Sequence, residues 1–239
     1  MNEDISIHEE IRLQKERCRE HLYSLAPIED DGWGKAAERL RRTPSYRNAR
    51  TVMVSLGSAL HQVRLNALTD RKMLILPTPG LQNGFVLLDP GKIPPQKKNL
   101  AIRLDQRNPY PQKIQYGKPM SHPIDLIVTD ALAAGRDGSR IGDGKGHLDL
   151  QYAILFALGW LAPQASVSAV TDRLLDSVPM EDTDVGAQRI VTATETVETG
   201  REDLPTLGVV WDRLAMKTIR RNDGLFFLYR AAHPKEPNS

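Results

Sequence analysis

Hydrophobic residues recur along the chain with two different periods, and the changes between them predict its elements. From about Ser6 to Leu25, and again around Ala36–Leu40, apolar residues stand at helical spacing among charged ones. Two further segments with helical spacing follow, at 59–70 and 148–160. Short β-branched or apolar runs bounded by turn residues predict strands at 50–56, 71–79, 84–90, 124–134, 164–171 and 188–195.

The order of these elements predicts the fold class. Strands alternate with helices, which is typical of a largely parallel sheet with helices on both faces. We therefore expect a three-layer α/β/α open, mostly parallel sheet in a single α/β domain over residues 1–230. The segment 91–123 is rich in proline and lysine and predicts a long excursion with one short helix. Residues 231–239 are expected to form a disordered tail.

Composition narrows the classes of function. A chain of 239 residues with 40% hydrophobic and 26% charged residues is typical of a soluble globular protein. The net charge of +2 gives no reason to expect nucleic acid or an anionic membrane as a partner. The polar N-terminus does not resemble a signal peptide, no apolar run spans a bilayer, and Cys18 has no second cysteine to pair with. A cytoplasmic protein is the simplest interpretation.

The stretch "DGSRIGDGKGHLD", residues 137–149, lies where a predicted strand gives way to a predicted helix. Backbone amides in a glycine-rich turn and at a helix N-terminus favour an anion. Arg140 and Lys145 would add positive charge, and Asp149 could cap the helix or hold magnesium. The stretch is not a P-loop, because Gly146 follows the lysine. Composition alone leaves a phosphate cradle and a solvated turn equally open.

Several segments together resemble the 5-formyltetrahydrofolate cyclo-ligase family. "GSRIGDGKGHLD" is similar to its glycine-rich signature, and "DLIVTDALAAGRDGSRIG" is similar to the strand that leads into it. "KERCREHLY" resembles the N-terminal helix of the family, and "VPMEDTDV" followed by "RIVTATETV" resembles its late acidic motif and terminal strand. The resemblance extends from about Ile7 to Leu214. Details such as "LPTP", "LLDP", "DLQYAILFALG" and "GVVWDRL" are closer to a divergent paralogue branch.

The resemblance implies a fold, a reaction and a set of site residues. The fold would be cyclo-ligase-like, in the NagB/RpiA/CoA-transferase-like class. The reaction would use ATP and Mg²⁺ to phosphorylate the formyl oxygen of 5-formyltetrahydrofolate, and ring closure would give 5,10-methenyltetrahydrofolate. The residues implied for ATP or phosphate binding are Lys15, Arg19, Arg140, Gly142, Gly144, Lys145 and Gly146. Those implied for catalysis are Arg140 and Lys145, and Asp149 is implied near the metal. Asp184 is a second metal candidate, and His147 is either a surface residue at the helix start or a catalytic residue, because an imidazole can transfer protons near neutral pH.

Departures from the family pattern are concentrated where a folate would be recognised. "SLGSALHQVR", which follows the first predicted strand, contains no carboxylate. His147 stands where the family has an aromatic residue, Thr183 replaces a histidine, and Leu174 replaces a glutamine. Asp182 and Asp184 form a carboxylate pair or simply an acidic turn.

These departures leave three functions open. The leading one is a cyclo-ligase-like enzyme acting on a small molecule, either a folate or another amide or formyl compound. The alternative is a non-catalytic nucleotide- or folate-binding regulatory protein. The third is a structural protein whose loop binds adventitious phosphate. We expect a monomer or a homodimer.

Overall fold

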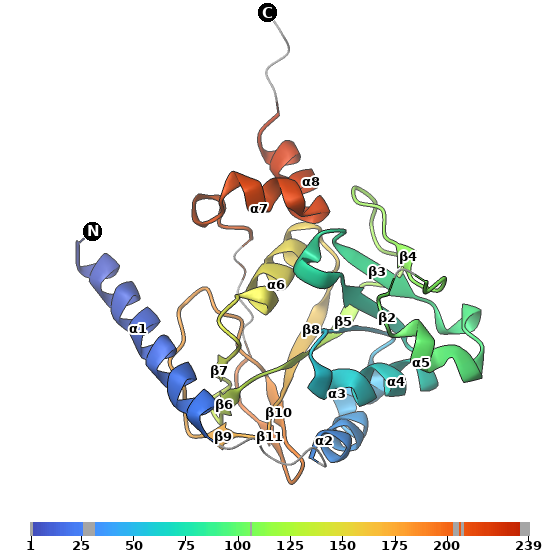
Figure 1. Cartoon of the computed structure of the whole chain (residues 1–239), viewed down its shortest axis with the longest axis horizontal. Helices are drawn as coiled ribbons and strands as arrows, with labels where there is room; N and C mark the ends of the chain where they lie inside the picture. The colour runs from blue at the N-terminus through green and yellow to red at the C-terminus, as the bar shows by residue number, and fades with distance from the viewer. Residues whose placement is uncertain (1, 26–31, 106, 203–205, 207, 235–239) are drawn as a thin grey trace, which may run out of the picture.

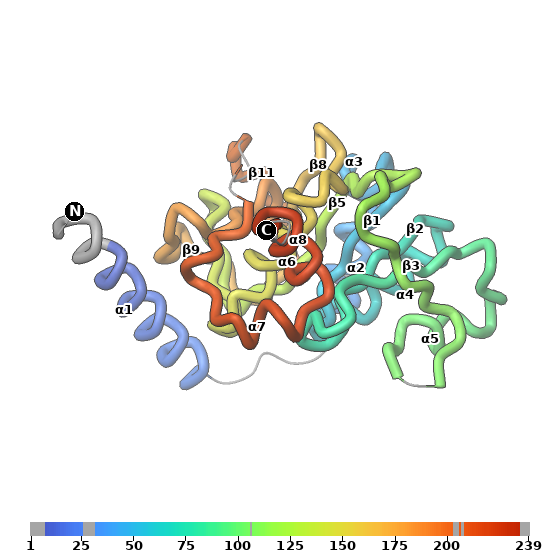
Figure 2. Tube along the Cα trace, turned by 90° about the horizontal axis from the view of Figure 1, so that it is seen from above, coloured from blue at the N-terminus to red at the C-terminus, as the bar shows by residue number. Residues whose placement is uncertain are grey.

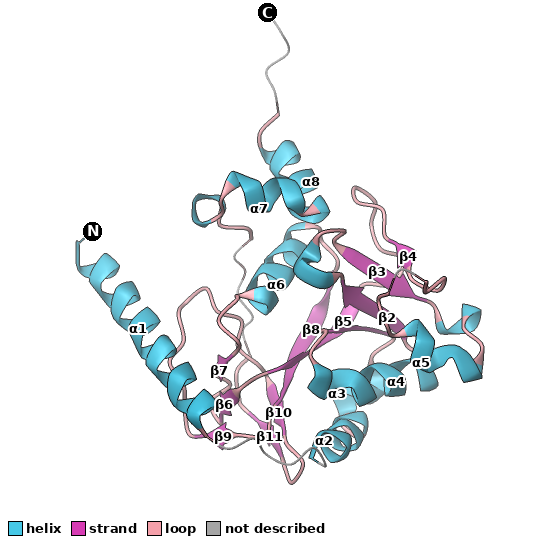
Figure 3. Ribbon diagram, viewed as in Figure 1, coloured by secondary structure: helices cyan, strands magenta, loops and turns pink. Residues whose placement is uncertain are grey.

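The computed structural model describes residues 2–25, 32–105, 107–202, 206 and 208–234, and it is built around a single large sheet (Figures 1 and 3). Within these residues eight strands pair in the order β11-β10-β8-β5-β1-β2-β3-β4. The five neighbouring strands β10, β8, β5, β1 and β2 are parallel, whereas β11 pairs antiparallel with β10, β3 with β2, and β4 with β3. Their bounds are Thr51–Val54 (β1), Met73–Pro77 (β2), Phe85–Leu88 (β3), Gln112–Lys113 (β4), Ile124–Asp130 (β5), Leu161–Val170 (β8), Arg189–Val191 (β10) and Thr196–Glu198 (β11).

Both faces of the sheet are covered by helices, as the alternation of strands and helices predicts. Side chains of a strand point alternately to opposite faces. Val52 and Val54 of β1 accordingly join one core with α2 (Gly32–Arg41) and α4 (His61–Thr69). Met53, between them, joins a second core with α6 (His147–Ala157). The predicted three-layer α/β/α architecture is confirmed.

The third predicted strand, at 84–90, is antiparallel to its neighbour, whereas an alternating α/β pattern would make it parallel. β3 pairs antiparallel with β2, with Leu76 opposite Val86. The link between them carries only the short 3₁₀ helix Pro79–Leu81, whereas a parallel connection needs a crossover of about a dozen residues or more. The long excursion that follows contains the one short α-helix expected, α5 (Lys98–Ala101), with 3₁₀ turns at Pro90–Lys92 and Pro95–Lys97.

A second, smaller sheet lies between β5 and the glycine-rich loop 142–146, and it includes the start of the stretch 137–149, which we expected directly after a single strand. β6 (Ala133–Gly135) pairs antiparallel with β7 (Arg140–Ile141) and parallel with β9 (Leu174–Leu175). The N-terminal helix α1 (Asn2–Ser24) lies against this sheet through Leu22. Much of α1 projects from the body of the molecule (Figure 2).

The C-terminal part forms helices that sequence patterning did not identify. α7 (Met216–Arg221) and α8 (Asp223–Ala232) bury Ile219 and Leu225 in the second core, beside α6. Helix α8 thus extends past residue 230, where the tail was expected to begin, and residues 235–239 lie outside the described part. The remaining helices are α3 (Pro44–Asn48) and the 3₁₀ turns Ser58–Leu60 and Trp211–Arg213. None of the described helices is both long and apolar enough to cross a membrane.

Candidate functional site

A large cleft opens at the carboxyl ends of the parallel strands. Its volume is about 1160 Å³, and its walls come from the segments that follow β1, β2 and β5, from α1, from the glycine-rich loop and from residues 208–214. Open α/β sheets bind ligands at this edge, and a cleft of this size is large enough for a nucleotide together with part of a second ligand.

The glycine-rich loop 142–146 has the backbone of an anion cradle. Gly144 (φ 86°) and Gly146 (φ 61°) both lie in the left-handed region, which side chains other than glycine disfavour. The amides of Gly142, Gly144 and Gly146 donate no hydrogen bond to any described residue. Three open amides just before α6, whose N-terminal end is electropositive, fit a phosphate group. The residues present therefore fit the expected phosphate-binding role.

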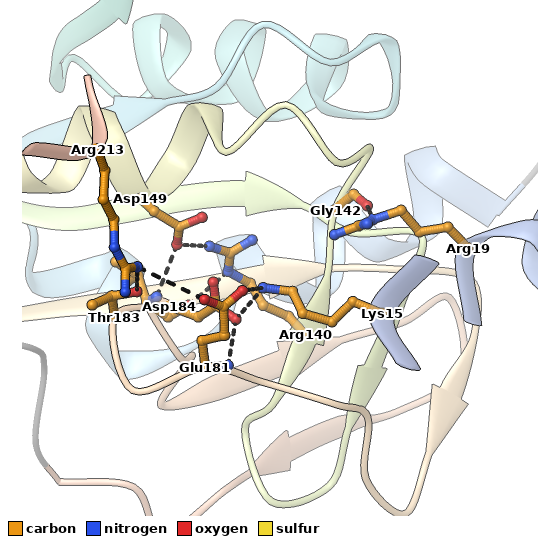
Figure 4. A network of polar contacts seen from close by, with 10 residues as sticks. Lys15, Arg19, Arg140, Gly142, Asp149, Glu181, Thr183, Asp184 and Arg213 are labelled. Atoms are coloured by element: carbon orange, nitrogen blue, oxygen red, sulfur yellow. Dashed lines mark hydrogen bonds and ion pairs between the residues drawn. The ribbon is translucent and has the colours of Figure 1, made fainter. Parts of the chain in front are cut away.

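Arg140 lies behind this loop with its guanidinium directed into the protein. It is buried, its Nε donates to the Val185 carbonyl oxygen at 2.6 Å, and its Nη2 pairs with Asp149 Oδ1 (Figure 4). The same Asp149 oxygen accepts the amide of Val185 at 2.8 Å. The Nη1 atom lies 3.6 Å from where a Cβ on Gly142 would stand. Arg140 thus braces the loop and leaves only one edge of its fork toward it.

Lys15 reaches from α1 into a buried ion-pair cluster with Glu181 and Asp184. Its Nζ lies 3.0 Å from Glu181 Oε1 and 2.6 Å from Asp184 Oδ2 (Figure 4). Asp184 Oδ2 also accepts the amide of Glu181 at 2.7 Å. Arg213, which follows the last strand of the large sheet in the chain, donates a hydrogen bond of 3.2 Å from Nη1 to Thr183 Oγ1. Lys15 and Asp184 are therefore neighbours, and the sequence analysis did not predict this pairing. It also did not identify Glu181, the third member of the cluster.

The other expected residues surround the loop from outside. Arg19 Nε donates to the Gly142 carbonyl oxygen at 3.2 Å, so that α1 also holds the loop. Lys145 is exposed and pairs with Asp143 at 2.8 Å. His147 is exposed at the first turn of α6, on the wall of the cleft. The structure thus brings every expected site residue to one cleft.

The metal position expected from Asp149 and Asp184 has few protein ligands. Among the described residues no group of three or more His, Cys, Asp or Glu side chains is close enough to hold a metal ion. Both carboxylates already accept hydrogen bonds from cationic side chains. Magnesium tolerates such a site, since it retains several waters and takes phosphate oxygens from its ligand. The carboxylates fit a magnesium ion that arrives with a nucleotide, and they do not form a preassembled cage.

Asp130, the last residue of β5, is a cleft residue that sequence reasoning missed. Its carboxylate lies against Gly57, after β1, where a Cβ would stand 1.7 Å from Oδ2. Arg64 holds that turn open by donating to the carbonyl oxygens of Ser55 and Gly57 at 2.8 and 3.0 Å. A carboxylate thus does occupy the space beside the carboxylate-free "SLGSALHQVR", supplied by another strand. A signal existed, namely an aspartate at the carboxyl end of a buried strand.

Burial raises the pKa of Asp130 above the ordinary aspartate value, and the negative charge of Asp143 adds to that effect. The positive charges of Arg64 and Arg140 oppose it.

The family is established by sequence comparison. The sequence model of the 5-formyltetrahydrofolate cyclo-ligase family matches residues 7–193, most of the chain. The chain belongs to this family. The resemblance read from the glycine-rich signature and its companion segments is confirmed, and the matched region contains the cradle, Lys15, Asp130 and Asp184.

The relatives of this cyclo-ligase family member include vertebrate proteins. The chain is 28% identical over 195 residues to the methenyltetrahydrofolate synthase domain-containing protein of Bos taurus, and the match covers 79% of this chain and 50% of the relative. The corresponding protein of Homo sapiens is 25% identical over 193 residues, with coverages of 78% and 50%. The chain therefore spans about half the length of the curated relatives that it matches.

Two solved structures are similar to this member of the family. The 5,10-methenyltetrahydrofolate synthetase of Aquifex aeolicus has a TM-score of 0.46 at 16% identity, covering 87% of this chain and 98% of the other. The enzyme of the same name from Mycoplasma pneumoniae has a TM-score of 0.45 at 13% identity, covering 77% and 98%.

Proposed function

We propose that the protein is an ATP- and Mg²⁺-dependent cyclo-ligase-like enzyme. Its reaction would activate a formyl or amide oxygen by phosphorylation so that a neighbouring amine can close a ring, with 5-formyltetrahydrofolate as the first substrate to test. The observation that carries the proposal is the cradle 142–146, with its open amides and neighbouring cations, in a chain of this family. A cytoplasmic location and a monomeric or homodimeric state accompany the proposal as predictions from the sequence.

The residues around the cradle would divide the work of holding a triphosphate. The loop amides would bind phosphate oxygens directly, and Lys145 and Arg19 would add positive charge from the open side. Arg140 would keep the loop in place and present its remaining edge. Because Lys15 pairs with two carboxylates, a polyphosphate arriving there would compete with Glu181 and Asp184 for its ammonium.

Metal binding and proton transfer would fall to residues at the start of α6 and in the late acidic turn. Asp149 and Asp184 would share a magnesium ion with phosphate oxygens and water. His147 lies at the wall of the cleft, and its imidazole would take the proton that the attacking amine loses.

The direct test is turnover of 5-formyltetrahydrofolate with ATP, with and without Mg²⁺, followed by the absorbance of the methenyl product. Lys145→Met is expected to raise the KM for ATP about tenfold, because it removes a charge-assisted phosphate contact. Lys113→Met is a closely matched control, since the two lysines are 65–66% exposed and each pairs with an aspartate at 2.8 Å. Equal KM values for the two variants would remove Lys145 from the proposal.

The regulatory alternative rests on the departures from the family pattern at His147, Thr183 and Leu174. It predicts that ATP binds, measured by calorimetry, while no methenyl product forms over a panel of formyl and amide compounds. If no nucleotide binds at all, the ATP-dependent reaction is wrong, and a regulatory protein that binds a folate is what remains of the alternative.

A further inference from the structure

The carboxylate of Asp130 reaches the cleft through a space that only glycine leaves. Gly57 follows β1, the neighbour of β5 in the sheet, and its missing side chain is what makes room. A Cβ there would stand 1.7 Å from Oδ2 and 2.7 Å from Oδ1, so an alanine would displace the carboxylate. Asp130 and residues 55–59 line the cleft together. The two strand ends thus shape one carboxylate-bearing wall.

This carboxylate has few donors within the protein. Its own backbone amide donates to it, and no other side chain of the described residues does. Its charged neighbours are Arg64 from α4, Arg140 from β7 and Asp143 from the loop. Both arginines direct hydrogen bonds elsewhere, Arg64 to carbonyl oxygens of residues 55 and 57 and Arg140 to Val185 and Asp149. A partly buried carboxylate with unused lone pairs beside a cleft is a candidate ligand-binding group.

The chemistry of the complementary ligand follows from the acceptor. An ionised carboxylate is acceptor-only, and its two oxygens match two parallel N–H donors. A resident metal ion fits less well, because no group of three or more ligating side chains lies together among the described residues. A nitrogen heterocycle that carries an amino group next to a ring N–H presents the matching pair of donors.

We propose that Asp130 is the specificity-determining residue of the second substrate, accepting paired N–H donors from an amino-substituted nitrogen heterocycle. This inference rests on the proposed function, which identifies the second substrate as a folate. Asp130 would take the recognition role that the segment after β1 lacks. Phosphate binding would not require Asp130, because the cradle amides and Lys145 supply the donors for the phosphate oxygens.

The test compares two small probes by calorimetry, 2-amino-4-hydroxypteridine and 4-hydroxypteridine, which lacks the amino group. The wild-type protein is expected to prefer the amino-bearing probe by tenfold or more, because a site built for a donor is left unpaired by the analogue without it. Asp130→Asn is expected to reduce that preference to about threefold or less, since it replaces two charged acceptors with one neutral acceptor. Equal affinity of the wild type for both probes, or an unchanged preference in the variant, would overturn the proposal.

Gly57→Ala provides an independent approach, since it displaces the Asp130 carboxylate without changing it chemically. It is expected to abolish the preference and to lower the Tm. In the double variant Gly57→Ala/Asp130→Ala the overlap is relieved, so the Tm should recover while the preference stays lost. A Gly57→Ala protein that keeps the wild-type preference would contradict the assignment.

Stabilisation by ATP separates this proposal from the proposed function. Asp130→Asn should not reduce the shift in Tm caused by ATP, because the variant keeps every phosphate donor and loses only a negative charge near the loop. Failure of ATP turnover with intact discrimination between the two pteridines would refute the enzyme and leave Asp130 as a binding determinant. Turnover of 5-formyltetrahydrofolate at wild-type KM by Asp130→Asn would refute Asp130 alone.

Discussion

The charged side chains that line the cleft differ in whether protein groups compensate them. Arg140 is compensated by Asp149 and by the Val185 carbonyl oxygen, and Lys15 by Glu181 and Asp184. Asp130 has two arginines nearby but no hydrogen bond from either. Compensated charges hold the walls of the cleft in place, whereas a carboxylate without side-chain donors lowers the stability of the empty protein and is available to a ligand.

At the residue scale, Asp130→Asn is expected to stabilise the empty protein at neutral and alkaline pH. Because the pKa of Asp130 is raised in the folded state, that state binds a proton more readily than the unfolded chain. The penalty of the charged group is therefore full above the raised pKa, and it disappears as the pH falls toward the ordinary value of 3.8. Urea unfolding of both proteins between pH 4 and pH 8 should show a difference that shrinks on acidification. A difference that is independent of pH would contradict this account.

At the scale of elements, α1 is held to the body through one face, and its polar contacts reach the cleft. Lys15 and Arg19 lie one turn apart, the first in the acidic cluster and the second on the Gly142 carbonyl oxygen. Leu22, one turn nearer the end of α1, packs on the small sheet. Docking of α1 and the shape of the glycine-rich loop 142–146 are therefore physically coupled.

Lys15→Met is expected to loosen α1 and the turn 181–185 together. The change removes the shared cation and leaves two partly buried carboxylates side by side. Amide exchange in both segments should accelerate about tenfold or more, while exchange in α4 stays unchanged. Arg12→Met on the same helix is the control, because the Arg12–Glu9 pair is 57–60% exposed and contributes little. Equal acceleration by both variants would show that the cluster does not hold α1.

Prediction from sequence succeeds for elements whose burial pattern is local. Apolar periodicity within one short segment of sequence predicts α6 and the strands β1, β5 and β8. The direction of β3 depends instead on the length of its connection, and the β6–β7 hairpin contains only two- and three-residue strands. The same limit applied in the cleft, where the glycine loop is contiguous in sequence but Asp130 and Gly57 meet only through the pairing of β1 with β5.

At the scale of the whole molecule, the C-terminal segment 208–232 contributes residues both to the cleft and to the second core. It lies outside the region matched by the family model, which ends at residue 193. Ile219 and Leu225 are fully buried beside α6, the helix that begins at the cradle. Between the large sheet and these helices, Val209, Val210, Arg213 and Leu214 line the cleft. The segment therefore contributes to the site as well as to stability.

Leu225→Ala is expected to lower the free energy of unfolding by about 2–5 kcal/mol, because it leaves a cavity between α8 and α6. Ile219→Val, in the same core, should cost only about 0.5–1.5 kcal/mol. Since α7 and α8 follow residues 208–214, which line the cleft, and anchor them to the core, Leu225→Ala should also speed proteolysis at residues 208–214 more than Ile219→Val does. Urea denaturation and limited proteolysis measure the two effects. Loss of stability without faster cleavage would mean that contacts of residues 208–214 themselves, such as that of Arg213 with Thr183, hold this segment at the cleft independently of α8.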